Sequence, residues 1–337
     1  MKQIRTLLYV ILLLLVSCSS PDVIIVTHFP KEQTLSAKAI TVPPILLLPE
    51  ALFIVDNFLI ALQPDKDTIF DVFQLPECTY LYSDITKGGG PNEFVVPYAN
   101  FVSVGNSEFK IIDSGIFVKT ARITNDSISI TNRKRISDYE LVNGMVEFND
   151  GSYCILNRMT GDKEYLKING IEKIEFSDYP ELTSNKNQKE NQFTTYFKYL
   201  VAPPESKDKF AAFYNKFKFI RYYDINGNLT KEIDVSIEPC HTVITNDIRD
   251  NFTYYYKPVA TERYIYALCL NKTDRDLEKD FESMNMEIQV WDWNGEPVIK
   301  YILDKSFTVF TVSSDDKTLY ASSFYVEDEI YVFDMIH

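Results

Sequence analysis

The sequence repeats one local pattern: short runs rich in Val, Ile, Phe and Tyr, separated by turns of Asp, Asn and Gly. Such runs are typical of β-strands joined by tight hairpins. Some hairpins centre on Asp, as in residues 51–61, 145–155 and 310–320. Others turn on Asp-x-Asn-Gly, as in residues 220–229 and 290–298. Asn-Gly readily supplies the positive φ angles of a tight turn. The pattern therefore predicts an all-β fold.

The hairpins recur with a period of about forty to fifty residues, which is the spacing of four-stranded propeller blades. The chain is therefore predicted to form a six-bladed β-propeller with four-stranded antiparallel blades. The predicted blades lie near residues 45–83, 98–137, 140–176, 195–236, 258–304 and 306–334. The polar stretch 183–192 is predicted to be a loop. The charged stretch 271–282 is predicted to be a short exposed helix or a solvated loop.

The last predicted blade is one strand short, because the chain stops soon after the strand-like run Tyr331–Asp334. Residues 22–28 are rich in β-formers and have no partner close in sequence. Pairing them with the last blade would close the ring and cover an exposed sheet edge. We therefore expect this N-terminal strand to close the last blade.

The N-terminus has the layout of an export signal. Lys2 and Arg5 precede an apolar run over residues 7–16, far shorter than the ~20 residues that a spanning helix needs. The run ends in Leu15-Val-Ser-Cys18, which resembles the lipobox of bacterial lipoproteins. Residues 1–17 are thus expected to be a signal peptide, and residues 18–337 a single propeller domain. Lipid on Cys18 would anchor it in a membrane.

The residue after Cys18 is Ser19 rather than Asp. By resemblance to the sorting of Gram-negative lipoproteins, this predicts delivery to the outer membrane within the cell envelope. Whether the domain then faces the periplasm or the cell surface stays open.

The amino-acid composition limits the classes of partner that the chain could bind. Hydrophobic residues make up 45% and aromatic residues 14% of the chain, which predicts a packed globular core. The net charge is -14, and loss of Lys2 and Arg5 makes it about -16. Such a surface repels nucleic-acid backbones, and no Lys/Arg cluster offsets it. We therefore expect no nucleic-acid partner.

The sequence gives little support for a metal site or a cofactor site. Cys78, Cys154, Cys240 and Cys269 lie at none of the spacings of zinc or redox motifs. The residues around these cysteines favour structural thiols, although an oxidising compartment would also allow disulfides to form. The only histidines are His28, His241 and His337, too few for a His-rich site. The sequence predicts neither a metal nor a cofactor.

One segment carries a family resemblance. Lys87-Gly-Gly-Gly-Pro-Asn-Glu-Phe94, followed by Pro97, resembles the Gly-x-Gly-Pro-x-Glu-Phe segment of TolB-like six-bladed β-propeller lipoproteins of Bacteroidetes, which have NHL-like relatives. The ending from residues 287–295 to 332–334 is also similar to that family. The resemblance implies the fold but no single activity. A P-loop is excluded because no Gly-Lys-Ser/Thr follows. An inter-blade connection is favoured, with Phe94 packed between blades and Glu93 capping amides.

Two classes of function stay open. A propeller that binds a peptide, a glycan or an envelope protein is favoured, with Tyr254, Tyr255 and Tyr256 as a candidate ligand face. The same tyrosines could instead pack between blades. The alternative is a carboxylate-based hydrolase or lyase acting on a glycan. Enzymatic activity is the less favoured class and no catalytic residue is assigned, because most acids lie in hairpin turns.

Two further triplets suggest modification. Asp67-Thr68-Ile69 and Asp126-Ser127-Ile128 resemble the Asp-Ser/Thr-aliphatic acceptor of general O-glycosylation in Bacteroidetes. Both triplets also read as simple turns entering strands. Thr68 and Ser127 are therefore candidate glycosylation sites.

Overall fold

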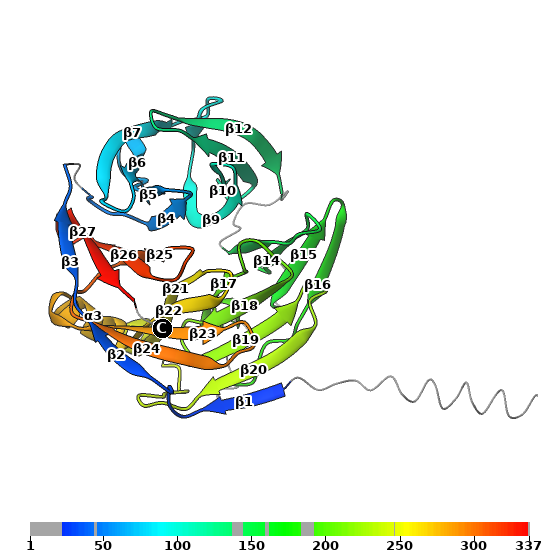
Figure 1. Cartoon of the computed structure of the whole chain (residues 1–337). Coiled ribbons are helices and arrows are strands. Elements are labelled where there is room, and N and C mark those ends of the chain that lie inside the picture. Colours follow the sequence, from blue (N-terminus) through cyan, green and yellow to red (C-terminus); the bar gives the residue numbers. More distant parts are fainter. Residues whose placement is uncertain are drawn as a thin grey trace, which may run out of the picture.

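The computed structural model describes residues 22–43, 46–136, 144–158, 162–182, 192–245 and 247–335. Six β-sheets are arranged around a central axis as the blades of a propeller (Figure 1). This confirms the all-β six-bladed fold. Three of the sheets have the four antiparallel strands that were predicted, whereas the other three carry a fifth strand that pairs parallel with its neighbour. The predicted signal peptide and Cys18 lie outside the described residues, as do His337 and most of the predicted loop 183–192.

The blades follow one another along the chain. Blade 1 contains β4 (Ala51–Val55), β5 (Phe58–Leu62), β6 (Thr68–Gln74), β7 (Thr79–Lys87) and β8 (Glu93–Phe94). Blade 2 contains β9 (Pro97–Gly105), β10 (Glu108–Asp113), β11 (Phe117–Ile123) and β12 (Ile128–Arg135). Blade 3 contains β13 (Met145–Glu147), β14 (Tyr153–Leu156), β15 (Tyr165–Asn169) and β16 (Glu172–Phe176).

Helix α2 (Gln192–Thr195) leads into blade 4, which contains β17 (Lys198–Val201), β18 (Lys209–Tyr214), β19 (Phe219–Asp224) and β20 (Leu229–Val235). After η2 (Ile248–Asp250), blade 5 contains β21 (Phe252–Ala260), β22 (Tyr264–Thr273), β23 (Met286–Asp292) and β24 (Pro297–Leu303). Blade 6 contains β25 (Val309–Val312), β26 (Thr318–Ser323) and β27 (Val326–Asp334).

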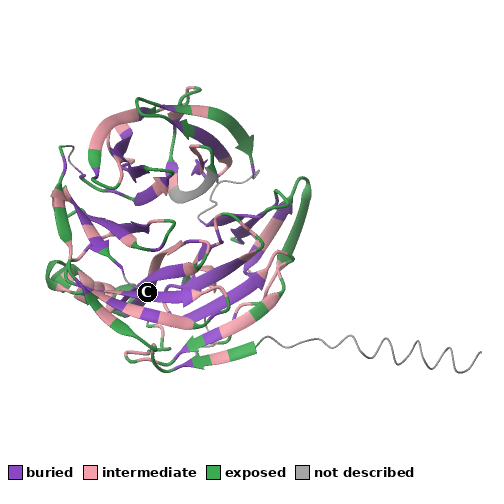
Figure 2. Cartoon of the chain, in the orientation of Figure 1, coloured by how far each residue is buried: buried purple, intermediate pink, exposed green. Residues whose placement is uncertain are grey.

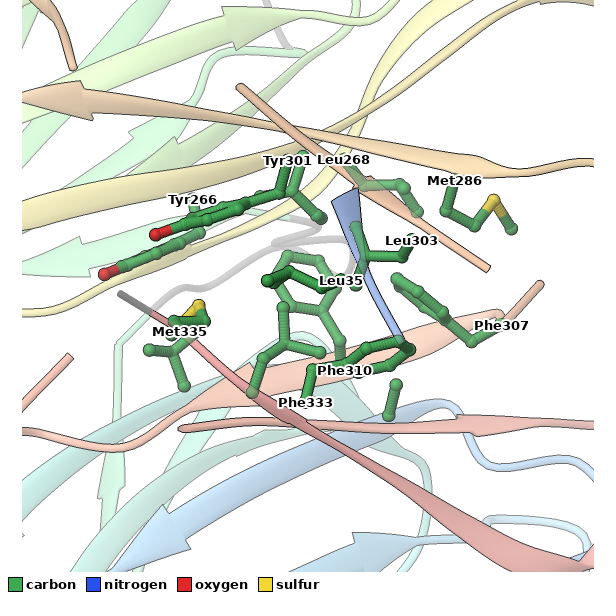
Figure 3. Close-up of a cluster of buried hydrophobic side chains, with 14 of the residues drawn as sticks. Leu35, Tyr266, Leu268, Met286, Tyr301, Leu303, Phe307, Phe310, Phe333 and Met335 are labelled. Carbon is green, nitrogen blue, oxygen red and sulfur yellow. The ribbon is translucent and has the colours of Figure 1, made fainter. Parts of the chain in front are cut away.

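The core lies between the blades rather than inside them. Each of the six inter-blade interfaces holds its own cluster of buried apolar side chains, and purple buried segments fill the inner strands in Figure 2. Figure 3 shows the cluster between blades 5 and 6, where Tyr301 and Leu303 meet Phe310 and Phe333. Removing these faces from water is the main force that holds neighbouring blades together.

The N-terminal segment closes the ring by a different strand from the one predicted. β3 (Lys38–Thr41) pairs antiparallel with β27 and completes blade 6. β1 (Asp22–Val26) instead pairs parallel with β20 of blade 4, and β2 (Glu32–Leu35) pairs parallel with β24 of blade 5. An N-terminal strand therefore closes the ring, but assigning residues 22–28 to the last blade was wrong. The apolar composition of residues 22–28 indicates that they pack against a sheet, but it does not identify which sheet.

Several local predictions are confirmed. The Asp-centred hairpins join first and second strands, and both Asp-x-Asn-Gly turns join third and fourth strands. Asp224 Oδ1 accepts hydrogen bonds from the Asn226 and Asn228 amides at 2.9 and 2.8 Å. The charged stretch forms the short helix α3 (Asp274–Asp280) and η3 (Phe281–Ser283). Blade 5 begins earlier than predicted, at Phe252, so the tyrosine triplet lies inside its first strand.

Candidate functional site

Because successive strands of a blade run in opposite directions, the connections between strands lie on two opposite faces of the propeller. We call one the loop face: it carries the links from each blade to the next and the links between second and third strands. The opposite turn face carries the hairpins between first and second and between third and fourth strands. In a propeller either face can present side chains around the axis.

Exposed apolar side chains gather on the loop face. Twelve large hydrophobic residues in the described parts of the chain are strongly exposed, and eight lie in loop-face connections. They come from four connections, β3–β4, β8–β9, β20–β21 and β26–β27: Leu47, Leu48, Val95, Val96, Val243, Ile248, Phe324 and Tyr325. Ile171, at 98% exposure, lies on the turn face. Apolar patches of this kind often mark an interaction surface.

An aromatic group forms part of this face. Phe281 of η3 packs against Tyr325 of the β26–β27 turn, with ring centroids 5.3 Å apart. Phe324 packs against Tyr325 at 4.2 Å. Phe324 and Tyr325 keep 36% and 41% of their surface exposed. Preformed, partly exposed rings suit contact with a peptide or a sugar.

Close to the axis, β21 places a lysine on an irregular stretch of backbone. The pairing of β21 with β22 shifts register between Tyr256 and Val259, and Lys257 has φ 40°. Bulges of this kind re-aim side chains. Lys257 Nζ donates a 2.7 Å hydrogen bond to the carbonyl oxygen of Glu50, at the entry to blade 1. It also lies 5.3 Å from the Tyr256 ring centroid.

Burial shifts the pKa values of Lys257 and Glu50 in opposite directions. Desolvation lowers the pKa of Lys257, and the charge of Glu50 opposes that shift. Desolvation raises the pKa of Glu50, which Lys257 partly counteracts and Asp65 reinforces. Each group is thus biased toward its neutral form. Opposite shifts of neighbouring groups are common at functional sites, although structural contacts produce them too.

The predicted tyrosine ligand face is only partly available. Tyr254 and Tyr255 are fully buried between blades 4 and 5. The Tyr255 hydroxyl donates to Gln289 at 3.0 Å, and the Tyr254 hydroxyl accepts from the His241 amide at 2.7 Å. These two residues were wrongly assigned to a surface, because an innermost strand packs against both neighbouring blades. Tyr256 alone is partly exposed, and its ring lies 5.7 Å from that of Tyr199.

The glycine-rich segment is an inter-blade connection, as predicted. Gly90 donates its amide to Glu93 Oε2 at 2.7 Å. A Cβ on Gly88 would lie 2.0 Å from the same oxygen, so the carboxylate occupies the space that a side chain would need. Phe94 is fully buried against Phe70 of blade 1 and Phe109 of blade 2. This segment joins the first two blades.

Of the candidate glycosylation residues, Thr68 begins a strand and Ser127 lies in the turn just before one. Ser127 is exposed in the turn between β11 and β12. This turn is held in place by the Tyr82 hydroxyl, which donates to the Thr124 carbonyl at 2.7 Å, and by Asp84, which accepts from the Ile128 amide at 2.7 Å. Thr68 begins β6 and is half-buried. Ser127 is the more accessible acceptor.

A buried charge network between blades 3 and 4 was not found from the sequence. Glu164 is 1% exposed and accepts hydrogen bonds from Tyr214 at 2.6 Å, from Arg221 at 2.8 Å and from Lys198. Desolvation lowers the pKa of Lys198 to about 8, against the charge of Glu164. Beside it, a pocket of about 360 Å³ is lined by Ser177, Asp178, Arg221, Gly227, Asn228 and Leu229. The residues of this network lie far apart in the sequence, so no local motif predicts it.

The cysteines fit the structural interpretation. Cys78, Cys154, Cys240 and Cys269 are free thiols, and three of them are buried. Burial raises the pKa of Cys78 to about 12, so that thiol stays protonated. Within the described residues, no group of His, Cys, Asp or Glu side chains could hold a metal ion. None of the helices in the same ranges is long and apolar enough to cross a membrane.

Comparisons with known proteins agree with this architecture. The chain is similar to a member of the DUF4221 family from Bacteroides vulgatus, with a TM-score of 0.62 and 9% identity over 89% of this chain and 97% of that one. It is more distantly similar to the Neurospora crassa Pan2 WD40 domain, with a TM-score of 0.48 and 10% identity over 86% and 89% of the two chains. The first of these likenesses concerns the fold alone. No curated protein sequence matches the chain. The model of the TolB-like 6-blade propeller-like family matches residues 28–315, and the chain therefore belongs to that family.

Proposed function

We propose that this chain is a lipid-anchored, extracytoplasmic propeller that binds a protein partner through its loop face. The observation that carries the proposal is the collection of eight exposed hydrophobic side chains on that face. They belong to four connections that adjoin five of the six blades, so they are spread over this face and not confined to one loop. Broad surfaces with aromatic anchors are typical of protein recognition.

The buried carboxylates support binding over catalysis. Asp71 accepts a 2.9 Å hydrogen bond from Lys66, Asp113 forms a 2.7 Å ion pair with Lys119, and Asp316 accepts a 2.8 Å bond from Arg263. Each links strands or neighbouring blades. A glycosidase needs two carboxylates that face a substrate. The acids described here serve the scaffold instead.

The anchor leaves the loop face open in this proposal. Asp22 pairs with Lys231, near the turn-face end of β20. Lipid on Cys18 would lie four residues earlier, a tether of at most ~14 Å. The domain would therefore sit close to its membrane, held at the rim of blade 4. By resemblance to sorted lipoproteins, this membrane would be the outer membrane.

Site-specific photocrosslinking in the producing cell tests the proposal. A photoreactive residue replaces Leu48 or Phe324 on the loop face, or Ile171 on the turn face as a matched exposed control. We expect the loop-face positions to crosslink to one discrete protein and Ile171 to give none. Equal products at Ile171, or none at either loop-face position, would reject loop-face recognition.

A further inference from the structure

Four of the twelve strongly exposed hydrophobic residues lie away from the loop face, and all four belong to two neighbouring blades. Ile171 lies in the β15–β16 turn and Ile174 in β16 of blade 3, whereas Val23 and Ile25 lie in β1 of blade 4. β16 and β1 form the outer edges of their blades (Figure 1). The exposed fractions run from 57% for Ile174 to 98% for Ile171. In the described parts of blades 1, 2, 5 and 6, no outer edge carries such a side chain. We call these four residues the apolar rim.

The side chains of Ile174 and Val23 project toward the same blade interface. Ile174 pairs with Lys167, whose Nζ donates a 2.7 Å hydrogen bond to a backbone carbonyl of blade 4. Val23 pairs with Glu232, which accepts a 2.6 Å hydrogen bond from Arg221, and Arg221 also donates to a buried carboxylate of blade 3. Paired residues of neighbouring strands project to the same face of a sheet. Both side chains therefore lie where the interface of blades 3 and 4 opens to the outside.

The apolar rim continues from one blade to the other. Phe176, at the end of β16, packs so closely against the β19–β20 turn that a Cβ on Gly227 would lie 2.9 Å from its ring. Leu229 follows this turn, and Phe176, Gly227 and Leu229 are each partly exposed. β1 pairs with β20 directly after this point. Ile174 and Val23 are thus joined by a strip of apolar surface.

The position of β1 decides which partner meets this surface first. Asp22 begins β1, and Cys18 lies four residues earlier in the sequence. With lipid on Cys18, the tether between the bilayer and the rim of blade 4 is at most ~14 Å long. A short tether gives its two ends a high effective concentration for each other. The lipid surface is therefore the partner to which the apolar rim is constantly presented.

The chemistry of the apolar rim fits lipid. All four residues are β-branched aliphatics, which gain from leaving water and need no directed hydrogen bond. Protein interfaces depend more on aromatic and Arg anchors. Exposed carboxylates flank the rim, because Glu172 follows Ile171 and Asp234 pairs with Ile25. These carboxylates repel anionic headgroups, so the surface fits a zwitterionic phospholipid.

We propose that the apolar rim of blades 3 and 4 is a membrane-contact surface that rests on zwitterionic phospholipid and orients the anchored domain. Ile171, at the tip of its turn, enters the boundary between headgroups and acyl chains, as the apolar face of an interfacial segment does. The ring then stands on its edge, and the loop face is directed sideways, where a protein partner can reach it. The inference rests on the lipid anchor of the proposed function and adds a second contact with the same membrane.

Fluorescence quenching on vesicles tests this contact with the anchor supplied chemically. The mature chain carrying Cys240→Ala is coupled through the Cys18 thiol to a maleimide phospholipid in phosphatidylcholine vesicles. Cys240 is replaced because the other thiols of the folded domain are buried. Ile171→Trp is compared with Leu48→Trp on the loop face. We expect phospholipid with brominated acyl chains to quench the emission added by Ile171→Trp by about half, and to leave that added by Leu48→Trp unchanged. Equal quenching in both variants, or none in Ile171→Trp, overturns the proposal.

Partitioning of the lipid-free chain provides a second measurement. The mature chain carrying Cys18→Ala is mixed with phosphatidylcholine vesicles, and Ile171→Asp should weaken its partition coefficient about tenfold, as loss of a buried Ile predicts. Ile248→Asp changes an equally apolar residue that is 69% exposed on the loop face, and it should have no effect. We expect weaker partitioning onto phosphatidylglycerol vesicles. A chain that is insensitive to Ile171→Asp, or that prefers phosphatidylglycerol, contradicts the proposal.

These measurements separate the rim contact from the proposed function. The maleimide phospholipid supplies the anchor whether or not the cell lipidates Cys18, so failure of native lipidation does not alter the quenching result. Loop-face recognition is measured by crosslinking at Leu48 and Phe324, which lie outside the apolar rim. A discrete protein crosslinked at Ile171 in the cell would replace the membrane with a protein partner and overturn the proposal.

Discussion

Lys257 and Glu50 are 207 residues apart in the sequence, yet Lys257 Nζ donates a 2.7 Å hydrogen bond to the Glu50 carbonyl oxygen. The bond joins the innermost strand of blade 5 to the segment that enters blade 1. Blade 6 lies between these two blades in the ring. Lys257 thus links blade 5 to the entry of blade 1 close to the axis, on the face that carries the exposed apolar loops.

This contact predicts how stability depends on pH. Burial lowers the pKa of Lys257 in the folded chain below its ordinary value of 10.5. Between the folded and unfolded pKa values, the unfolded chain binds more protons, so this group's contribution to stability rises with pH. We expect the free energy of unfolding of the wild type, relative to Lys257→Met, to increase as the pH rises toward 10.5. Lys317→Met, at a largely exposed site, should show no such trend in denaturant titrations.

The glycine-rich connection predicts a coupled pair of substitutions. Gly88 has φ 157°, which residues with a Cβ rarely adopt, and a Cβ there would also meet Glu93 Oε2, so we expect Gly88→Ala to lower the free energy of unfolding by about 1–3 kcal/mol. Glu93→Ala removes the obstacle but also the acceptor for the Gly90 amide. The double variant should therefore lose clearly less than the sum of the single variants. Gly89→Ala is the control, because its Cβ would meet no atom within 4 Å. Simple additivity in the cycle would contradict this account.

Ring closure by β3 predicts a difference between two adjacent prolines. The Val42 amide donates a 2.8 Å hydrogen bond to the Asp328 carbonyl, and by alternation the Ile40 amide also faces β27. Ile40→Pro should therefore break the ladder and lower the free energy of unfolding by about 3 kcal/mol. Ala39→Pro, whose amide points outward, should lose less than about 1 kcal/mol. Similar losses in chemical denaturation would argue against β3 as the closing strand.

The sequence predicted strands and turns well because both depend on local chemistry. The predicted bounds lie within five residues of the strands for four of the six blades, whereas blade 1 continues to Phe94 and blade 5 begins at Phe252. Partner choice depends instead on distant surfaces. Residues 22–28 are more apolar than Lys38-Ala-Ile-Thr41, so local pattern favoured the wrong closing strand. Tyrosine composition likewise did not separate buried Tyr255 from the partly exposed Tyr256. The Glu164 network joins residues up to 57 positions apart, beyond any local motif.

Glycosylation, proposed from the two Asp-Ser/Thr-aliphatic triplets, should favour the turn that presents Ser127. This hydroxyl is exposed and its turn is held by Tyr82 and Asp84, whereas Thr68 is half-buried at the start of a strand. We expect Ser127→Ala to remove a glycan from the intact mass of the native protein, and Thr68→Ala to remove less. Ser129→Ala, at an exposed neighbour outside the triplet, should leave the mass unchanged apart from the substitution. An unmodified wild-type mass would rule the proposal out.

Lipidation of Cys18 makes the last prediction. The Leu15-Val-Ser-Cys18 sequence follows an apolar run that is too short to span a bilayer, so membrane attachment would depend on the lipid. A single acyl chain binds only marginally, whereas the several chains of a mature lipoprotein hold stably. We expect Cys18→Ala to move the protein from the membrane fraction to the soluble fraction. Cys240→Ala is the matched control, because Cys240 is the most exposed of the remaining thiols and lies in the folded domain. That variant should stay with the membrane. If the Cys18→Ala protein remains bound after a carbonate wash, the domain is held by some other contact, and the short tether to the rim of blade 4 would have to be abandoned.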